Sequence, residues 1–209
     1  MSVEAAEVTH GIRRVVDLLP GHSGRVHLDN NLLLISMTTD PSASRAQARL
    51  GIRAHLRDAL GEWLDLKPHA ITFISEPGKP PRVIIDGEPE PGLSISHETG
   101  LSLAAVNLQG PVGVDLMKPQ DIADWLIVSK DYLGPTITCQ LLATPDTQRT
   151  LAFTKAWCQR EALLKLHGQP LMESAALPVL AGCVGQIDLP LPWVAMVALP
   201  VITLEAGPD

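Results

Sequence analysis

The alternation of apolar and polar positions divides the chain into short strands and two long helices. A mostly apolar run over 32–37 predicts a buried strand, and alternation over 93–97 predicts a strand with one polar face. Shorter apolar runs predict further strands at 71–74, 83–85, 101–106, 112–116 and 193–199. The runs 101–106 and 112–116 are expected to pair, because Gly110-Pro111 favours a turn between them.

Helical spacing predicts a first long helix over 43–60, starting at Asp40-Pro41-Ser42 with Asp or Ser as the N-cap. A second helix is predicted over 150–167, where Gly168 would form the C-cap. The segment 120–150 predicts shorter helical pieces. Gly134-Pro135 and Thr144-Pro145 would break them.

Composition limits the classes of protein that the chain can represent. Its 209 residues are 45% apolar, which suffices for one domain or two small ones. A net charge of −7 argues against a nucleic-acid partner, since neutralising phosphates needs a basic surface. Cys139, Cys158 and Cys183 form no CxxC pair, so we expect free thiols in a reducing compartment and no zinc site.

Two segments bear on location. The stretch 1–10 is polar and acidic, and does not resemble a signal peptide. The longest uncharged run, 189–204, contains three prolines and is shorter than the roughly 20 residues of a spanning helix. We therefore expect a cytoplasmic protein with no membrane partner.

An acidic residue interrupts the apolar strand 112–116. Asp115 lies between Val114 and Leu116, and a carboxylate inside an apolar strand must be paired, hydrogen-bonded or bound to a cation. One interpretation is a structural contact with a turn or an arginine. The other is a cation site.

Four arginines, at 45, 49, 53 and 57, repeat every four residues and so share one helix face. This stripe is either a solvated basic surface or an anion site. On the second helix, Trp157, Glu161 and Lys165 share a stripe in the same way. There the alternatives are a surface ion pair, contributing about 0.3–0.5 kcal/mol, or a second carboxylate facing Asp115.

Ser96 and His97 suggest nucleophilic catalysis, but neighbouring residues on a strand point to opposite faces. A hydrolase would also need a base that a third group orients, and the sequence offers no such set. His97 is instead interpreted as a structural histidine or as a donor to an anion.

Four motifs, in order along the chain, resemble those of the 4'-phosphopantetheinyl transferase family, in its longer, monomeric, surfactin-type branch. They are Gly78-Lys79-Pro80, Ser94-Ile95-Ser96-His97, Gly113-Val114-Asp115, and the segment 157–165 leading into Gly168. The resemblance covers about residues 40–170. It implies two similar α+β subdomains related by a pseudo-twofold axis, 1–110 and 111–209, with the active site in the cleft between them.

The resemblance also implies an enzyme and its partners. Such a transferase moves the 4'-phosphopantetheine arm of coenzyme A to a serine of an acyl or peptidyl carrier protein, with Mg²⁺, and releases adenosine 3',5'-bisphosphate. Carboxylates are suitable Mg²⁺ ligands beside phosphate oxygens. Asp115 and Glu161 would hold the metal, and both would take part in catalysis with Lys165. The residues expected to bind coenzyme A are Arg45, Lys79, Ser96, His97, Asp115 and Lys165.

Two positions depart from the family pattern. Met117 stands where many members have a third carboxylate, and a thioether is a poor Mg²⁺ ligand, so weaker metal binding is expected. Arg160 stands where lysine is usual, and the two cations are not equivalent. Met117 also favours the alternative of a weakened binding module of the same fold, whereas retention of Asp115, Glu161 and Lys165 favours the enzyme.

Overall fold

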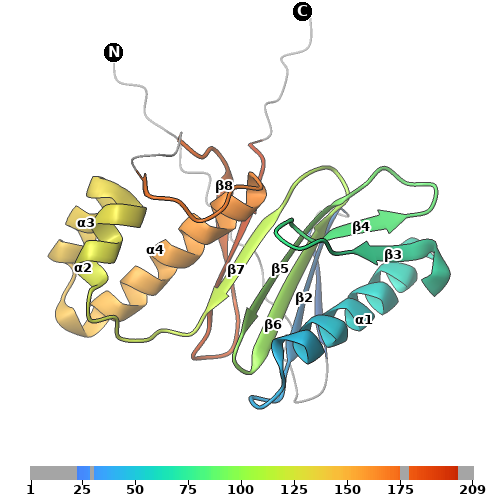
Figure 1. Cartoon of the computed structure of the whole chain (residues 1–209), viewed down its shortest axis with the longest axis horizontal. Helices are drawn as coiled ribbons and strands as arrows, with labels where there is room; N and C mark the ends of the chain where they lie inside the picture. Colours follow the sequence, from blue (N-terminus) through green and yellow to red (C-terminus); the bar gives the residue numbers. More distant parts are fainter. Residues whose placement is uncertain (1–22, 29–30, 175–178, 202–209) are drawn as a thin grey trace, which may run out of the picture.

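Two sheets, each backed on its outer face by a long helix, form the layers of the molecule (Figure 1). The computed structural model describes residues 23–28, 31–174 and 179–201. Its first half contains β1 (Ser23–Leu28), β2 (Leu32–Thr38), α1 (Arg45–Leu64), the short turn η1 (Pro68–Ala70), β3 (Ile71–Ile74), β4 (Arg82–Ile85), β5 (Gly92–Glu98) and β6 (Leu101–Asn107). Its second half contains β7 (Gly113–Met117), α2 (Trp125–Val128), the π-helical turn η2 (Ser129–Leu133), α3 (Gly134–Ala143), α4 (Asp146–Leu166), β8 (Cys183–Ile187) and β9 (Val194–Leu199). The mixed α+β class is confirmed.

The strands form three antiparallel sheets. The first has the order β1-β2-β6-β5, and the second has the order β7-β9-β8. The third is the hairpin of β3 and β4, in which Ile71 lies opposite Ile85. The strands β2 and β6 are central in their sheet, and both of its faces are covered, which explains why these strands are apolar on consecutive positions rather than alternately.

Three apolar clusters hold the layers together. The first lies between the two large sheets and includes Leu34, Leu103, Val114 and Val197. A second joins the other face of the first sheet to α1 and the hairpin, through residues such as Leu33, Ile35, Leu56, Leu60, Val83 and Ile85. The third joins α4 to the outer face of the second sheet, through Cys158, Ala162, Leu166, Val194, Met196 and Ala198.

The predicted pairing of 101–106 with 112–116 is wrong. In the structure β6 pairs with β2 on one edge and with β5 on the other, so neither edge is left for another strand. The chain turns through Gly110, with φ of 147°, and enters the second sheet as β7, which pairs with β9.

The first helix begins later than predicted. Its N-cap is Ser44, whose hydroxyl accepts the backbone N–H of Gln47, while the Gln47 side chain accepts the Ser44 N–H. This reciprocal capping box satisfies two free helix donors. Asp40 instead accepts the N–H and hydroxyl of Ser42 in a separate turn.

The second long helix begins earlier than predicted, at Asp146, and ends at Leu166, two residues before Gly168. Gly168 has a positive φ of 61°, the conformation that favours glycine just beyond a helix end. The predicted breaks at Gly134-Pro135 and Thr144-Pro145 are confirmed, because α3 begins at Gly134 and α4 follows Pro145.

Other predictions concern the ends and divisions of the chain. The predicted absence of a signal peptide concerns residues 1–10, outside the described residues. The boundary near Gly110, dividing 1–110 from 111–209, and the pseudo-twofold relation stay predictions. No helix within 23–28, 31–174 or 179–201 has the length and apolar content to cross a bilayer. The three cysteines are free, as predicted.

Side chains, rather than a backbone ladder, join the edge strands β5 and β7. The hydroxyls of Ser94 and Ser96 accept the N–H groups of Val114 and Leu116 at 3.0 and 3.2 Å. The Glu98 carboxylate accepts the Lys118 N–H at 3.4 Å. Acceptors two residues apart on β5 thus meet donors two residues apart on β7, so this seam satisfies strand-edge donors that would otherwise be exposed or unpaired.

On its other side β7 lies against α4 with almost no intervening space. A Cβ atom at Gly113 would collide with the Ala162 carbonyl oxygen and lie 2.6 Å from the backbone nitrogen of Leu166. Only a residue without a side chain allows the two backbones to approach this closely. The helix is therefore held in a fixed position beside the strand that carries Asp115.

We expect Gly113→Ala to lower the free energy of unfolding by about 3 kcal/mol, since backbone atoms must separate to admit the methyl group. Urea denaturation measures this change. Gly51→Ala is the matched control. Its methyl group meets the thioether end of Met37, and alanine favours the helix by about 1 kcal/mol, so little net change is expected. A Gly113→Ala protein as stable as the wild type would contradict the close approach of β7 and α4.

Candidate functional site

The predicted site residues line one cavity of about 860 Å³. Its walls come from α1, the loop between β3 and β4, β5, β7 and α4. The cavity contains every residue that the sequence analysis assigned to the site: Arg45, Lys79, Ser96, His97, Asp115, Glu161 and Lys165. The structure therefore brings together groups separated by more than 100 positions in the sequence.

Asp115 contacts two of these residues directly. Its Oδ1 atom accepts a hydrogen bond from the Ser96 hydroxyl at 2.9 Å and another from Lys165 Nζ at 2.7 Å. Lys165 Nζ also donates to the Val114 carbonyl oxygen at 3.0 Å. The Asp115 side chain is only 11% exposed, so its ion pair with Lys165 is largely shielded from water.

Glu161 provides a second carboxylate to the same wall, one helical turn before Lys165. Burial raises the pKa of Glu161, the negative charge of Asp115 raises it further, and Lys165 opposes both effects. Two carboxylates that repel each other across a cavity favour a cation between them. Among the described residues no group of three or more histidine, cysteine, aspartate or glutamate side chains is placed to hold a metal. These two carboxylates would hold a hard cation if other oxygen donors completed its coordination.

The opposite wall of the cavity is cationic. Arg45, Arg49 and Arg53 project from α1 at successive turns and line the cavity together, so this part of the stripe is placed where it could bind an anion. Arg57, the fourth arginine, lies 5.3 Å from the centre of the Phe73 ring and donates to the Ile71 carbonyl oxygen. It therefore has a structural role.

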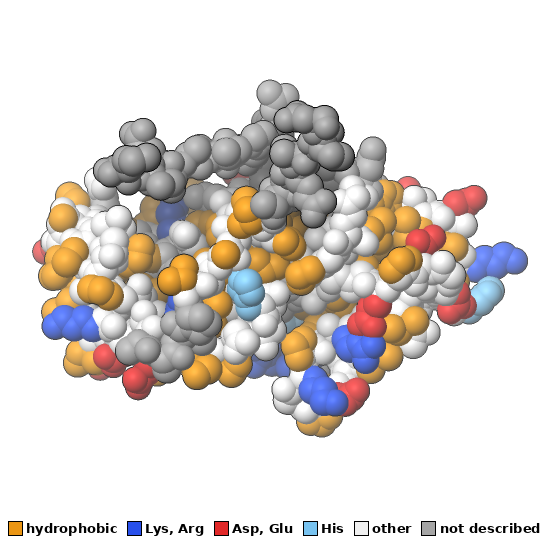
Figure 2. Space-filling view, turned by 90° about the horizontal axis from the view of Figure 1, so that it is seen from above, with side chains coloured by type: hydrophobic (Ala, Val, Ile, Leu, Met, Phe, Trp, Pro, Cys, Tyr) orange, Lys and Arg blue, Asp and Glu red, His pale blue; other side chains and the backbone are white. Residues whose placement is uncertain are grey.

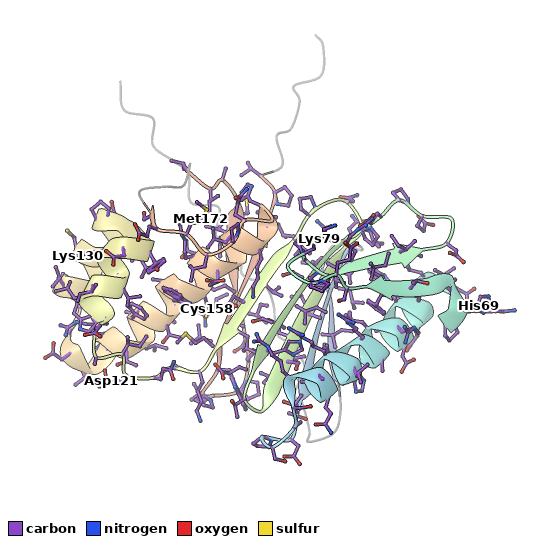
Figure 3. All side chains as sticks on the ribbon, viewed as in Figure 1. His69, Lys79, Asp121, Lys130, Cys158 and Met172 are labelled. Atoms are coloured by element: carbon purple, nitrogen blue, oxygen red, sulfur yellow. The ribbon has the colours of Figure 1, made fainter. Side chains whose placement is uncertain are left out.

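Lys79 lies on the loop between β3 and β4, which extends over β5 (Figure 3). Its ammonium group forms a 2.6 Å ion pair with Glu76 of the same loop. Both side chains are largely exposed, so this pair stabilises the loop only slightly.

From above, charged side chains of both signs gather towards the end of the molecule formed by α1 and the hairpin (Figure 2).

His97 is neutral at ordinary pH. Burial, with a smaller effect from the nearby cations Arg45, Arg49, Lys165 and Arg53, lowers the pKa of His97 from 6.5 to about 4. Its Nδ1 atom lies 2.8 Å from the hydroxyl of buried Ser102. When Ser102 donates to Nδ1, the ring proton resides on Nε2, which can then donate to an anion.

Aromatic residues support the α4 wall. Trp157 stacks on Phe153 with ring centres 6.0 Å apart and meets the edge of Tyr132 at 5.9 Å. These contacts hold Trp157 in the cavity wall, one turn before Glu161. They are of the offset and edge-to-face kinds that aromatic pairs prefer.

The two unusual positions differ in their surroundings. Met117 lines the cavity and also packs against the apolar cluster under α4. Arg160 is not among the residues lining the cavity, and the described residues offer no hydrogen-bond partner to its buried Nε and Nη2 atoms. Burial lowers the pKa of Arg160 accordingly.

The sequence analysis did not single out every residue of the cavity. It missed Glu98, which lines the cavity and accepts the Lys118 N–H at the junction of β5 and β7. The alternation Ser94, Ser96, Glu98 along β5 was the available signal, because the three residues share one face of the strand. It chose Arg45 from the stripe, whereas the structure places Arg49 and Arg53 in the same wall.

The cavity therefore has two chemically different ends. One presents two carboxylates and a lysine, which suit a cation and a developing negative charge. The other presents three arginines, which suit phosphate groups. An elongated ligand with several phosphates would match both ends at once.

Comparison with known proteins agrees with this geometry. No family model matches the chain. Over 119 residues, 56% of this chain, it is 34% identical to the 4'-phosphopantetheinyl transferase HetI of Nostoc sp. (strain PCC 7120). This similarity supports the resemblance to the phosphopantetheinyl transferase superfamily that the sequence motifs indicated. The aligned region covers 49% of HetI, so the chain spans about half the length of the curated relative it matches.

The resemblance predicted from four short motifs is thus supported at the level of the superfamily, while the surfactin-type branch stays a prediction. The individual roles of the site residues also stay predictions. Their common position in one cavity is a finding of the structure.

The pKa of His97 makes stability depend on pH. Below pH 6.5 the unfolded chain protonates this histidine while the folded protein does not until about pH 4, so stability falls across that interval. We expect a loss of about 1 kcal/mol between pH 6.5 and 5, after discounting for solvent screening. Urea unfolding at both pH values measures it. His97→Gln is the control, and an equally steep pH dependence in that variant would show that other groups cause the loss.

Proposed function

We propose that the protein transfers the 4'-phosphopantetheine arm of coenzyme A to a serine of an acyl or peptidyl carrier protein. The serine oxygen forms a bond to the β-phosphorus, the bond between that phosphorus and the bridging oxygen breaks, and adenosine 3',5'-bisphosphate leaves. The matched relative is named for 4'-phosphopantetheinyl transfer, which supports the class of reaction. The finer expectations, a monomer of the surfactin-type branch acting in the cytoplasm, are part of the same proposal.

One observation carries the proposal: Asp115, Glu161 and Lys165 face the same cavity as Arg45, Arg49 and Arg53. Coenzyme A carries a pyrophosphate and a separate 3'-phosphate, so its two anionic groups need two cationic positions. Lys165 suits the pyrophosphate. The arginines, with His97 and Lys79, suit the nucleotide end.

Mg²⁺ fits the donor set of the acidic end. Asp115 and Glu161 would supply two hard oxygen ligands, and phosphate oxygens and water would supply the others. When bound there, the cation would neutralise the charge of the pyrophosphate.

The protein's own residues then act on the serine and the leaving group. Glu161 accepts the serine proton directly or through one water molecule. Lys165 donates to the leaving phosphate oxygens as their negative charge develops. Trp157 and its aromatic neighbours hold the α4 wall rigid, so both groups keep their positions.

A second candidate is a coenzyme A or carrier-protein binding module with weakened chemistry. Met117 favours it, because a thioether lines the cavity where many relatives have a carboxylate. The two candidates differ in one measurable property. The module would bind coenzyme A and transfer nothing.

Mass spectrometry of an apo carrier protein tests the reaction. Incubation with this protein, coenzyme A and Mg²⁺ is expected to add the mass of one phosphopantetheine, and EDTA should prevent the gain. Glu161→Gln removes the charge at constant shape and should lower the rate at least 100-fold, in the range usual for a lost general base. Circular dichroism confirms that the variant is folded. No mass gain with several carrier types, while coenzyme A binds, would overturn the transferase in favour of the module.

A third carboxylate at position 117 should strengthen the metal site. We expect Met117→Glu to lower the Mg²⁺ concentration that gives half the maximal rate, because the added ligand replaces a water molecule. Met117→Gln is the uncharged control of similar size, in which the Mg²⁺ dependence should change less. If the glutamate and glutamine variants have equal Mg²⁺ dependence, residue 117 does not face the metal.

A further inference from the structure

The hydroxyl of Ser96 has a double role in the seam. It accepts the Leu116 N–H at 3.2 Å and donates its own proton to Asp115 Oδ1 at 2.9 Å. Ser96 is 6% exposed, so water does not compete strongly for either bond. A serine hydroxyl has a single proton, and here Asp115 receives it.

Ser94, two residues earlier on the same face of β5, makes one of these bonds but not the other. Its hydroxyl accepts the Val114 N–H at 3.0 Å, and its exposure of 4% is similar. Both serines therefore join β5 to β7 in the same way. Of the two serines, only Ser96 has a described hydrogen bond to the Asp115 carboxylate.

Lys165 also donates a hydrogen bond to Asp115, but the proposed reaction would break that bond. If Lys165 turns to the pyrophosphate, as proposed above, Asp115 Oδ1 loses its 2.7 Å bond to Nζ. The bond to Ser96 needs no such rearrangement, since the Leu116 N–H fixes the hydroxyl from behind. Ser96 would then be the group that keeps the carboxylate oriented.

We propose that Ser96 is a positioning residue, which orients the Asp115 carboxylate for the cation and does not contact coenzyme A. This inference rests on the proposed function. It assigns Ser96 to the metal end of the cavity, whereas the family resemblance suggested the coenzyme A set. A hydrogen bond from Ser96 to a phosphate would require its proton to leave Asp115. Groups that orient a metal ligand in this way commonly change metal affinity 10- to 100-fold when removed.

The test measures Mn²⁺ binding directly, by the loss of the electron paramagnetic resonance signal of free Mn²⁺ in the presence of coenzyme A. We expect Ser96→Ala to weaken Mn²⁺ binding about tenfold relative to Ser94→Ala. Ser94→Ala is the matched control, because it leaves one β7 N–H without its acceptor but does not touch Asp115. Thermal unfolding should show similar losses of stability in the two variants.

Two further measurements distinguish the possible failures. Ser96→Cys keeps the side-chain volume and supplies a weaker donor, so it should fold and still bind Mn²⁺ weakly, even if Ser96→Ala does not fold. In EDTA, coenzyme A should bind Ser96→Cys and Ser94→Ala equally, and weaker binding by Ser96→Cys would mean that Ser96 contacts coenzyme A. Equal Mn²⁺ affinity of Ser96→Cys and Ser94→Ala would overturn the positioning role alone. Failure of the wild-type protein with coenzyme A to bind Mn²⁺ would overturn the metal assignment itself.

Discussion

The junction between β5 and β7 determines how the rest of the molecule is arranged. Each of these strands is the edge of its own sheet, and no backbone ladder joins them. Side chains of β5 accept the outward N–H groups of β7 instead, while the apolar inner faces of the two sheets pack on each other. These side-chain acceptors satisfy the N–H groups of Val114 and Leu116, which would otherwise be buried without a partner.

The acidic end of the cavity depends on this junction for its position. The strand that receives the side-chain acceptors also carries Asp115, and the close approach at Gly113 fixes α4 beside it. Backbone packing therefore fixes the positions on α4 from which the Glu161 and Lys165 side chains extend. Catalytic geometry that tolerates only small displacements benefits from such support.

Local patterns predicted much of this structure. Periodicity located the helix of the arginines, the strand of Asp115 and the shared stripe of Trp157, Glu161 and Lys165, because these depend on neighbours in the sequence. Strand pairing was not predictable in the same way. The run 101–106 had two partners remote in sequence, β2 and β5, and nothing local reveals that both edges of a strand are already occupied.

Side-chain roles, too, were predictable where they depend on neighbours in the sequence and not where they depend on distant strands. The sequence placed Ser96 in the site because of its motif, yet its bond to Asp115 depends on how two distant strands align. The four arginines looked equivalent by spacing, and tertiary packing separated them, since Arg57 found an aromatic ring and a carbonyl oxygen outside the cavity. The helical repeat indicates the direction in which each arginine side chain points, but it does not specify which groups that side chain meets.

The arginines of α1 have a kinetic consequence. The chain as a whole is anionic, with a net charge of −7, and so repels a polyanion at a distance. Close to the cavity that repulsion reverses, because three guanidinium groups occupy one wall. At an ionic strength near 0.15 M the long-range term is screened within about 8 Å, which leaves the local attraction dominant. Capture of a phosphate-rich ligand should therefore depend on salt in a way that the overall charge would not suggest.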